Sequence, residues 1–142
     1  MDIDEVKKIY GNKNFIISKI ETLNAIKNLR SIAKKSNAML IDRGDLSRYI
    51  PIEKIPIIQE NILEFSKKNS FETFVATNLL ETMIVENQPT RAESHDIYST
   101  LLQGSQGLVL AAETAIGVDP VNCVKFLKSC INAFNKRKKY KF

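Results

Sequence analysis

Four short apolar runs, each followed by a stretch with helical spacing, constrain the fold of this chain more than any other feature. The runs are Phe15–Ile20, Ala38–Ile41, Thr73–Ala76 and Gly107–Ala111. Near-continuous apolar runs of this length are typical of strands buried on both faces of a parallel sheet. Strands that alternate with helices predict an α/β fold with right-handed crossovers.

The segments between the runs carry apolar residues at steps of three and four, as helices that pack on a sheet require. These stripes are Leu23, Ile26, Leu29 and Ala33; Ile55, Ile58, Ile62 and Phe65; Ile97 and Leu101; and Val124, Leu127, Ile131 and Phe134. Thr90 and Glu93 have the spacing of a capping box, and Pro120 after Asp119 is typical of a helix start. A further helix is expected over 4–10. The prediction is four βα units, which form either a small open sheet or part of a barrel.

Size and composition indicate one folded domain over residues 1–142. Hydrophobic residues make up 44% of the chain and charged residues 26%, which argues against disorder. No apolar run approaches the ~20 residues that cross a bilayer, so we expect no membrane segment. The acidic stretch Met1–Glu5 lacks the apolar core of a secretory signal, which favours a cytoplasmic protein.

The net charge of +5 is concentrated near the carboxyl end, in a basic tail over residues 136–142. Nucleic-acid binding would need a basic stripe on a folded face, so we expect a solvated tail and no nucleic-acid partner.

The two cysteines, Cys123 and Cys130, fall seven residues apart on one predicted helix. That spacing corresponds to ~10.5 Å along the helix axis, beyond the ~7 Å limit between the Cα atoms of a disulfide. We therefore expect free, buried thiols in a reducing compartment.

Polar residues interrupt the pattern where each predicted strand ends. They are Lys19 and Glu21; Asp42, Arg43, Gly44 and Asp45; Thr77 and Asn78; and Glu113 and Thr114. Ligands of α/β folds bind at the carboxyl ends of parallel strands. Carboxylates beside a lysine suit an oxygen-ligated Mg²⁺ and an anionic substrate. The alternative is that these charges are merely solvated loop residues.

At these residues the sequence resembles pyruvate kinase, through several motifs in the same order. The motifs are Ile16–Glu21, Arg43–Leu46 followed by Ile50, Pro51 and Glu53, Ala76–Met83, Pro89–Glu93, and Glu113–Ala115 with Gly117. The match covers about residues 13–134. It implies four parallel βα units that form half of a TIM-type (β/α)₈ barrel, its strands five to eight.

The resemblance also implies roles for individual residues. Lys19 would stabilise the transferring phosphoryl group and the enolate, and Glu21 and Asp45 would bind the divalent metal, Mg²⁺ or Mn²⁺. The backbone amides of Gly44 and Asp45 would hold the substrate carboxylate. Thr77 would lie beside the reacting carbon. The expected function is therefore phosphoryl-transfer or enolate chemistry on pyruvate, phosphoenolpyruvate or a related 2-oxo acid.

Other parts of the family pattern have no counterpart in this sequence. These are the first four βα units, the lid domain and the carboxyl-terminal domain, with the phosphate-gripping arginine, the potassium ligands and most of the nucleotide site. We therefore expect a homodimer or a complementary half-barrel to complete the barrel, with Arg91 near a neighbouring subunit. The alternative is a non-catalytic binding or scaffold module, or a fragment of a longer enzyme.

Overall fold

The computed structural model describes residues 3–11 and 13–140 and contains one parallel sheet. Its strands are β1 (Ile17–Ile20), β2 (Ala38–Asp42), β3 (Glu72–Ala76) and β4 (Gly107–Val109), in the order β1-β2-β3-β4. Each strand lies beside the next one along the chain, as in the wall of a barrel. The sheet does not close, because within the described residues β1 and β4 have no neighbour on their outer edges. The predicted α/β half-barrel is confirmed.

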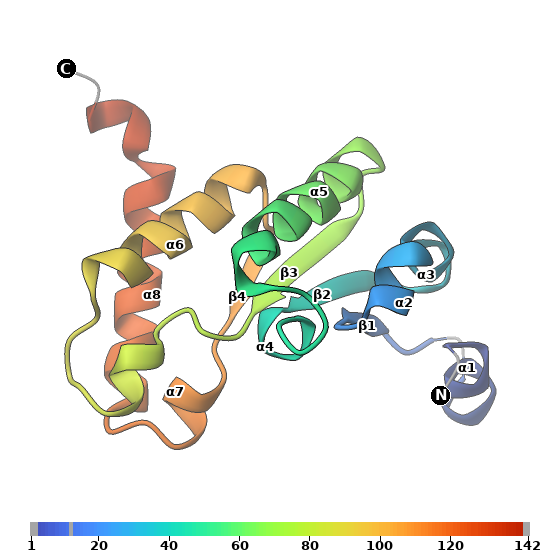
Figure 1. Ribbon diagram of the computed structural model, residues 1–142, viewed down its shortest axis with the longest axis horizontal. Helices are drawn as coiled ribbons and strands as arrows, with labels where there is room; N and C mark the ends of the chain where they lie inside the picture. The colour runs from blue at the N-terminus through green and yellow to red at the C-terminus, as the bar shows by residue number, and fades with distance from the viewer. Residues whose placement is uncertain (1–2, 12, 141–142) are drawn as a thin grey trace.

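Helices connect the strands and flank the sheet (Figure 1). They are α1 (Ile3–Tyr10), α2 (Leu23–Lys27), α3 (Leu29–Lys35), α4 (Arg43–Leu46), α5 (Ile55–Lys68), α6 (Arg91–Gln103), α7 (Ala112–Ala115) and α8 (Pro120–Asn135), with 3₁₀ turns η1 (Ile52–Lys54), η2 (Glu81–Ile84) and η3 (Arg137–Tyr140). Figure 1 shows α5 and α6 along the sheet and α1 at the β1 end, near α2 and α3, while α8 packs against α6.

Several boundaries differ from the sequence pattern. The strand β1 begins at Ile17 rather than at Phe15, whose side chain is exposed. The first crossover is two helices rather than one, because Asn28 ends α2 and its side-chain amide donates to the Asn24 carbonyl oxygen at 2.9 Å. The strand β4 ends at Val109 rather than at Ala111. The Glu113 carboxylate accepts a hydrogen bond from the Ala111 N–H at 2.9 Å and so turns the chain out of the sheet.

The two faces of the sheet differ in burial. On the helix side, Ile20, Met39, Ile41 and Val75 are fully buried and join the core beneath α5. The other face, which we call the open face, carries Ile17, Leu40, Phe74 and Val109, since these residues alternate with the buried ones along each strand. Ile17 is 47% exposed and Val109 is 39% exposed. Burial on both faces, as the sequence pattern predicts, is therefore wrong for this chain alone.

Residues 136–139 of the carboxyl-terminal tail are exposed, as expected for a solvated tail, and part of the tail is helical. Residues 137–140 form η3, and the Arg137 guanidinium stacks over the Phe134 ring at 3.8 Å. Residues 141–142 of the predicted tail lie outside the described residues. Both cysteines lie on α8 and are free, as predicted. None of the helices within 3–11 and 13–140 is long and apolar enough to cross a bilayer.

Candidate functional site

Lys19 lies at the centre of a cluster of charges at the carboxyl ends of β1 and β2. Its ammonium nitrogen is 2.6 Å from a Glu21 carboxylate oxygen, 2.9 Å from Asp42 and 3.6 Å from Asp45. Lys19 and Glu21 face the same side because they are two residues apart on an extended chain. The structure thus brings together four residues that the sequence pattern singled out at strand ends, which are Lys19, Glu21, Asp42 and Asp45.

Asp42 is a predicted strand-end residue for which the family resemblance implies no role. It is the last residue of β2, and its carboxylate accepts hydrogen bonds from the Thr77 hydroxyl at 2.8 Å and from the Asp45 N–H at 3.4 Å. Asp42 also pairs with Lys19, so it joins the ends of three strands. Its position at a strand end beside Lys19 and Asp45 was the available signal.

The contacts within the cluster shift the pKa values of Lys19 and Asp42. Hydrogen bonds to Glu21 and then to Asp42 raise the pKa of Lys19, so the ammonium stays charged. Burial on its own raises the pKa of Asp42. The hydrogen bonds that its carboxylate accepts from Lys19, Thr77 and the Asp45 amide outweigh burial and hold this pKa below its usual value.

The turn after β2 places Gly44 against the end of β3. The helix α4 begins directly after Asp42, which is its N-cap. A Cβ atom at Gly44 would lie 2.7 Å from the Thr77 Cγ2 atom, closer than real side-chain contacts allow. Glycine is therefore required by close approach rather than by backbone dihedrals.

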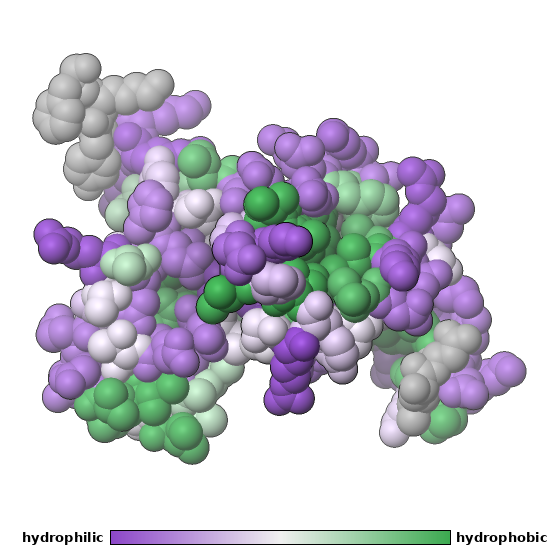
Figure 2. Space-filling view, in the orientation of Figure 1, coloured by the Kyte–Doolittle hydropathy of each residue, from purple (hydrophilic) through white to green (hydrophobic). Residues whose placement is uncertain are grey.

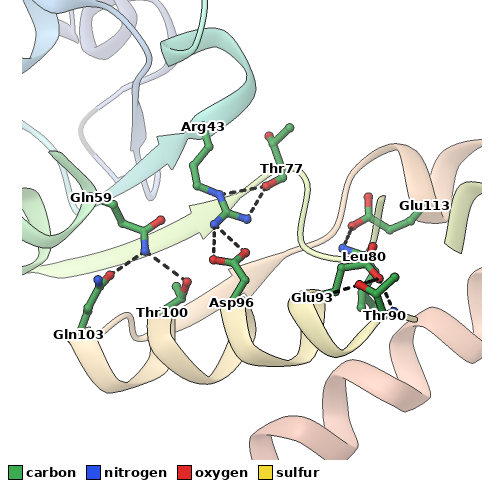
Figure 3. A network of polar contacts seen from close by, with 10 residues as sticks. All are labelled: Arg43, Gln59, Thr77, Leu80, Thr90, Glu93, Asp96, Thr100, Gln103 and Glu113. Carbon is green, nitrogen blue, oxygen red and sulfur yellow. Dashed lines mark hydrogen bonds and ion pairs between the residues drawn. The ribbon is translucent and has the colours of Figure 1, made fainter. Parts of the chain in front are cut away.

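The turn after β3 is held in an unusual conformation. Thr77 and Asn78 have φ angles of 77° and 56°, a region that non-glycine residues rarely adopt. The Arg43 guanidinium stabilises this turn, because it donates two hydrogen bonds to the Thr77 carbonyl oxygen, at 2.7 and 3.0 Å. The same guanidinium pairs with both carboxylate oxygens of Asp96, at 2.8 and 2.9 Å (Figure 3).

Glu113 joins the turns after β3 and β4. Its side chain is only 1% exposed, and its carboxylate accepts hydrogen bonds from the backbone N–H groups of Leu80 and Ala111, at 3.2 and 2.9 Å. Figure 3 shows it directed at Leu80, away from the Arg43 contacts. Glu113 therefore supports the site and is not one of the clustered carboxylates.

Arg91 does not join the cluster. It is the first residue of α6 and its side chain is exposed. The capping box at the start of α6 is present as predicted. The Glu93 carboxylate accepts a hydrogen bond from the Thr90 N–H at 2.7 Å, and the Thr90 hydroxyl accepts one from the Glu93 N–H at 3.2 Å.

The cluster has the composition of a cation site. One oxygen from each of Glu21, Asp42 and Asp45 lies within 4.8 Å of the others. Three carboxylates and one ammonium carry a net charge of about −2, which one divalent cation would neutralise. Magnesium in proteins takes one or two carboxylates and keeps its other positions for water or substrate oxygens. The donor set therefore fits Mg²⁺ or Mn²⁺.

Comparison with known proteins assigns the chain to a family. The profile of the family described as "Pyruvate kinase, barrel domain" matches residues 1–124. The chain belongs to the pyruvate kinase family. Pyruvate kinase of Thermotoga maritima is 41% identical over 134 residues, which is 94% of this chain and 28% of that protein. The Methanocaldococcus jannaschii pyruvate kinase is 40% identical over 129 residues, 89% of this chain and 29% of the relative.

A third pyruvate kinase, from Borreliella burgdorferi, is 38% identical over 139 residues, 97% of this chain and 29% of that protein. The chain therefore spans less than a third of the length of these curated relatives. The resemblance of the motifs to pyruvate kinase is confirmed, and the matched part is a pyruvate kinase barrel segment with an open sheet.

Proposed function

We propose that this chain provides a Mg²⁺-dependent site for pyruvate, phosphoenolpyruvate or a related 2-oxo acid, as part of a pyruvate-kinase-like transferase. The observation that carries the proposal is the contact of the Lys19 ammonium with three carboxylates at the strand ends. Pyruvate kinase relatives along almost the whole chain support the same chemistry.

Each residue of the cluster has a separate task in this proposal. Glu21 and Asp45 bind the cation, and Asp42 positions Lys19. A bound Mg²⁺ or Mn²⁺ would polarise the substrate oxygens. The Lys19 ammonium neutralises negative charge on the enolate or the transferring phosphoryl group.

The two turns near the cluster would hold and orient the substrate. Gly44 and Asp45 offer backbone N–H groups to the substrate carboxylate. The Asp45 N–H makes only a long 3.4 Å hydrogen bond to Asp42, which a carboxylate ligand can replace. Thr77 lies beside the reacting carbon, and the Arg43 hydrogen bonds fix its backbone.

The single domain over 1–142 supplies one half of the barrel, and four more strands are needed to close it. A second copy or a complementary half-barrel would supply them, with Arg91 near a neighbouring subunit. Complete kinase activity belongs to that assembly. The two free thiols fit a reducing cytoplasm.

Calorimetric titration with oxalate, a mimic of enolpyruvate, tests this function. We expect saturable binding that requires Mg²⁺ and is lost in Asp45→Asn. The control is Glu60→Gln, which changes an exposed carboxylate on α5 and should bind oxalate like the unmodified chain. Oxalate binding that is equally strong without Mg²⁺, or that is retained in Asp45→Asn, would contradict the proposal.

A second candidate is a binding or scaffold module, or a fragment of a longer enzyme, that has no activity of its own. The uncovered apolar face of the sheet favours this second candidate, because a face of this kind is typical of a surface that binds another polypeptide segment. Exchange of the pyruvate methyl protons with D₂O separates the two candidates. Mg²⁺-dependent exchange that is lost in Lys19→Met supports the enzyme, whereas a stable heteromeric complex without exchange supports the scaffold.

A further inference from the structure

The outer side of α8 carries positive charge that no neighbouring acidic residue in the sequence balances. From Pro120 to the end of the chain there are seven lysine and arginine residues and no aspartate or glutamate. On α8 and its C-cap, polar residues recur at steps of three and four, which places them along one side of the helix. We call this row the basic stripe; its members, all exposed, are Lys125, Lys128, Asn132 and Lys136.

The basic stripe continues into the turn that follows α8. The Lys139 N–H in η3 donates to the Lys136 carbonyl oxygen at 2.9 Å, so both lysines belong to one folded segment. Within the residues that the structure describes, no cationic group from Lys125 to Lys139 forms an ion pair. Nucleic-acid binding requires a basic stripe on a folded face. The structure therefore supplies on α8 the feature that the tail alone does not offer.

A cavity of about 470 Å³ lies beside the stripe, between α6 and α8. Its floor is aromatic: the Tyr98 and Phe134 rings meet edge to face with their centroids 5.6 Å apart, and the Arg137 guanidinium lies 3.8 Å from the Phe134 centroid. Tyr98 is 41% exposed, so part of its ring is accessible. Aromatic rings and guanidinium planes are the surfaces on which unpaired bases stack.

Hydroxyl groups lie where the cavity meets the stripe. Ser129 lines the cavity and directly follows Lys128, and Ser94 lines it from α6. Each hydroxyl can donate to or accept from a base edge or a sugar. The cavity thus combines a stacking surface with polar groups, next to a row of cations.

The shape of the charged surface favours a polyanion over a small anion or a membrane. From Lys125 to Lys136 the stripe is about 16 Å long, at a rise of 1.5 Å per residue, which is too long for one compact anion to span. A helix that lies on a membrane exposes large apolar side chains beside its cations. From Lys125 onward, the exposed residues of α8 are instead lysine, serine, asparagine and one alanine.

We infer that the outer side of α8 binds a single-stranded nucleic acid. Phosphate groups pair with Lys125, Lys128 and Lys136, and one base enters the cavity and stacks on Tyr98. Because phosphates carry no sequence information, binding should depend little on base sequence. The inference goes beyond the proposed function and is independent of it, since none of these residues belongs to the cluster around Lys19. Figure 1 shows α8 at the opposite end of the molecule from α1.

Fluorescence anisotropy of a labelled oligothymidylate or oligouridylate of about 15 nucleotides, titrated with the full chain, tests this inference. We expect the logarithm of the affinity to fall with the logarithm of the salt concentration with a slope of about −3, because each of about four phosphate contacts to a single strand contributes about −0.7. The triple variant Lys125→Gln, Lys128→Gln, Lys136→Gln should bind at least ~10-fold more weakly, with a slope near about −1. Tyr98→Leu should weaken binding by about 5-fold and leave the slope unchanged.

A matched control removes the same amount of charge from another exposed surface. It is the triple variant Lys27→Gln, Arg30→Gln, Lys34→Gln on α2 and α3, which should bind both strands like the unmodified chain. Equal weakening by the two triple variants would show attraction by net charge alone and would overturn the inference. A duplex of the same length that binds as tightly as the single strand, or tighter binding to phosphatidylserine vesicles, would overturn it as well. Binding of either strand supports the inference, and a preference for one strand identifies RNA or DNA as the source.

Discussion

At the scale of single residues, the contact between Gly44 and Thr77 joins the turns after β2 and β3. A Cβ atom at position 44 would lie 2.7 Å from Thr77 Cγ2, so Gly44→Ala must push the Thr77 turn away. We predict a loss of about 1–2 kcal/mol in the free energy of unfolding, measured by urea titration.

The second substitution in this prediction is Thr77→Ser, which removes Cγ2 but keeps the hydroxyl that bonds to Asp42. Combined with Gly44→Ala, it should restore about 1 kcal/mol relative to the sum of the single effects. Additive losses would show that the two residues do not touch.

The charged cluster shows how far single residues can be predicted from sequence. Lys19, Glu21 and Asp45 follow from strand ends and from family motifs, and the structure places them together. Asp42 is also a predicted strand-end residue, but its place between Lys19 and Thr77 does not follow from the sequence pattern. This place depends on the strand register. Lys19 of β1 pairs with Leu40 of β2, and Asp42 lies two residues after Leu40 on the same face of the sheet.

At the scale of elements, Glu93 connects the start of α6 to the turn η2. Its carboxylate accepts hydrogen bonds from the backbone N–H groups of Thr90 and Thr82, each at 2.7 Å. Burial on its own raises the pKa of Glu93, but these hydrogen bonds outweigh burial and keep the pKa below the ordinary 4.5. The ionised carboxylate thus stabilises the folded chain.

The substitution Glu93→Gln should lower the free energy of unfolding by about 1 kcal/mol at pH 7. Because the folded pKa is depressed, this stabilisation is present above the unfolded pKa and is lost as the pH falls through the folded value. Urea titrations should therefore show a difference between wild type and variant that is constant above about pH 5 and vanishes in more acidic solution.

The control for this prediction is Glu53→Gln, whose carboxylate is exposed on η1. It should show no such pH-dependent difference. If Glu93→Gln behaves like this control, the capping box does not stabilise the connection between α6 and η2.

The elements themselves were largely predictable. All four strands and the main helices follow from apolar spacing. The stripe of α8 was placed incorrectly, because Val124 is 53% exposed and the helix buries Cys123 and Leu127 against α6 and α7 instead. The break between α2 and α3 at Asn28 was not predictable from that spacing, because Leu23, Ile26, Leu29 and Ala33 continue across it. The early end of β4 depends on a hydrogen bond from Ala111 to Glu113, which spacing does not encode.

At the scale of the whole molecule, the surface reflects the open sheet. Figure 2 shows hydrophobic surface gathered over η2 and α7, where Val85, Ile116 and Val118 are exposed. The sequence predicts strands buried on both faces, and the structure of this chain buries only one. An apolar run predicts that a strand is covered on both faces, but it does not say which segments cover it.

We propose that Glu21 and Asp45 bind a divalent cation beside Lys19. Electron paramagnetic resonance of Mn²⁺, titrated with the chain in the presence of oxalate, measures this binding. We predict one bound Mn²⁺ per chain, lost in Glu21→Gln and retained in the exposed control Glu60→Gln. Mn²⁺ that stays free with the unmodified chain, or that binds equally to Glu21→Gln, would contradict the claim.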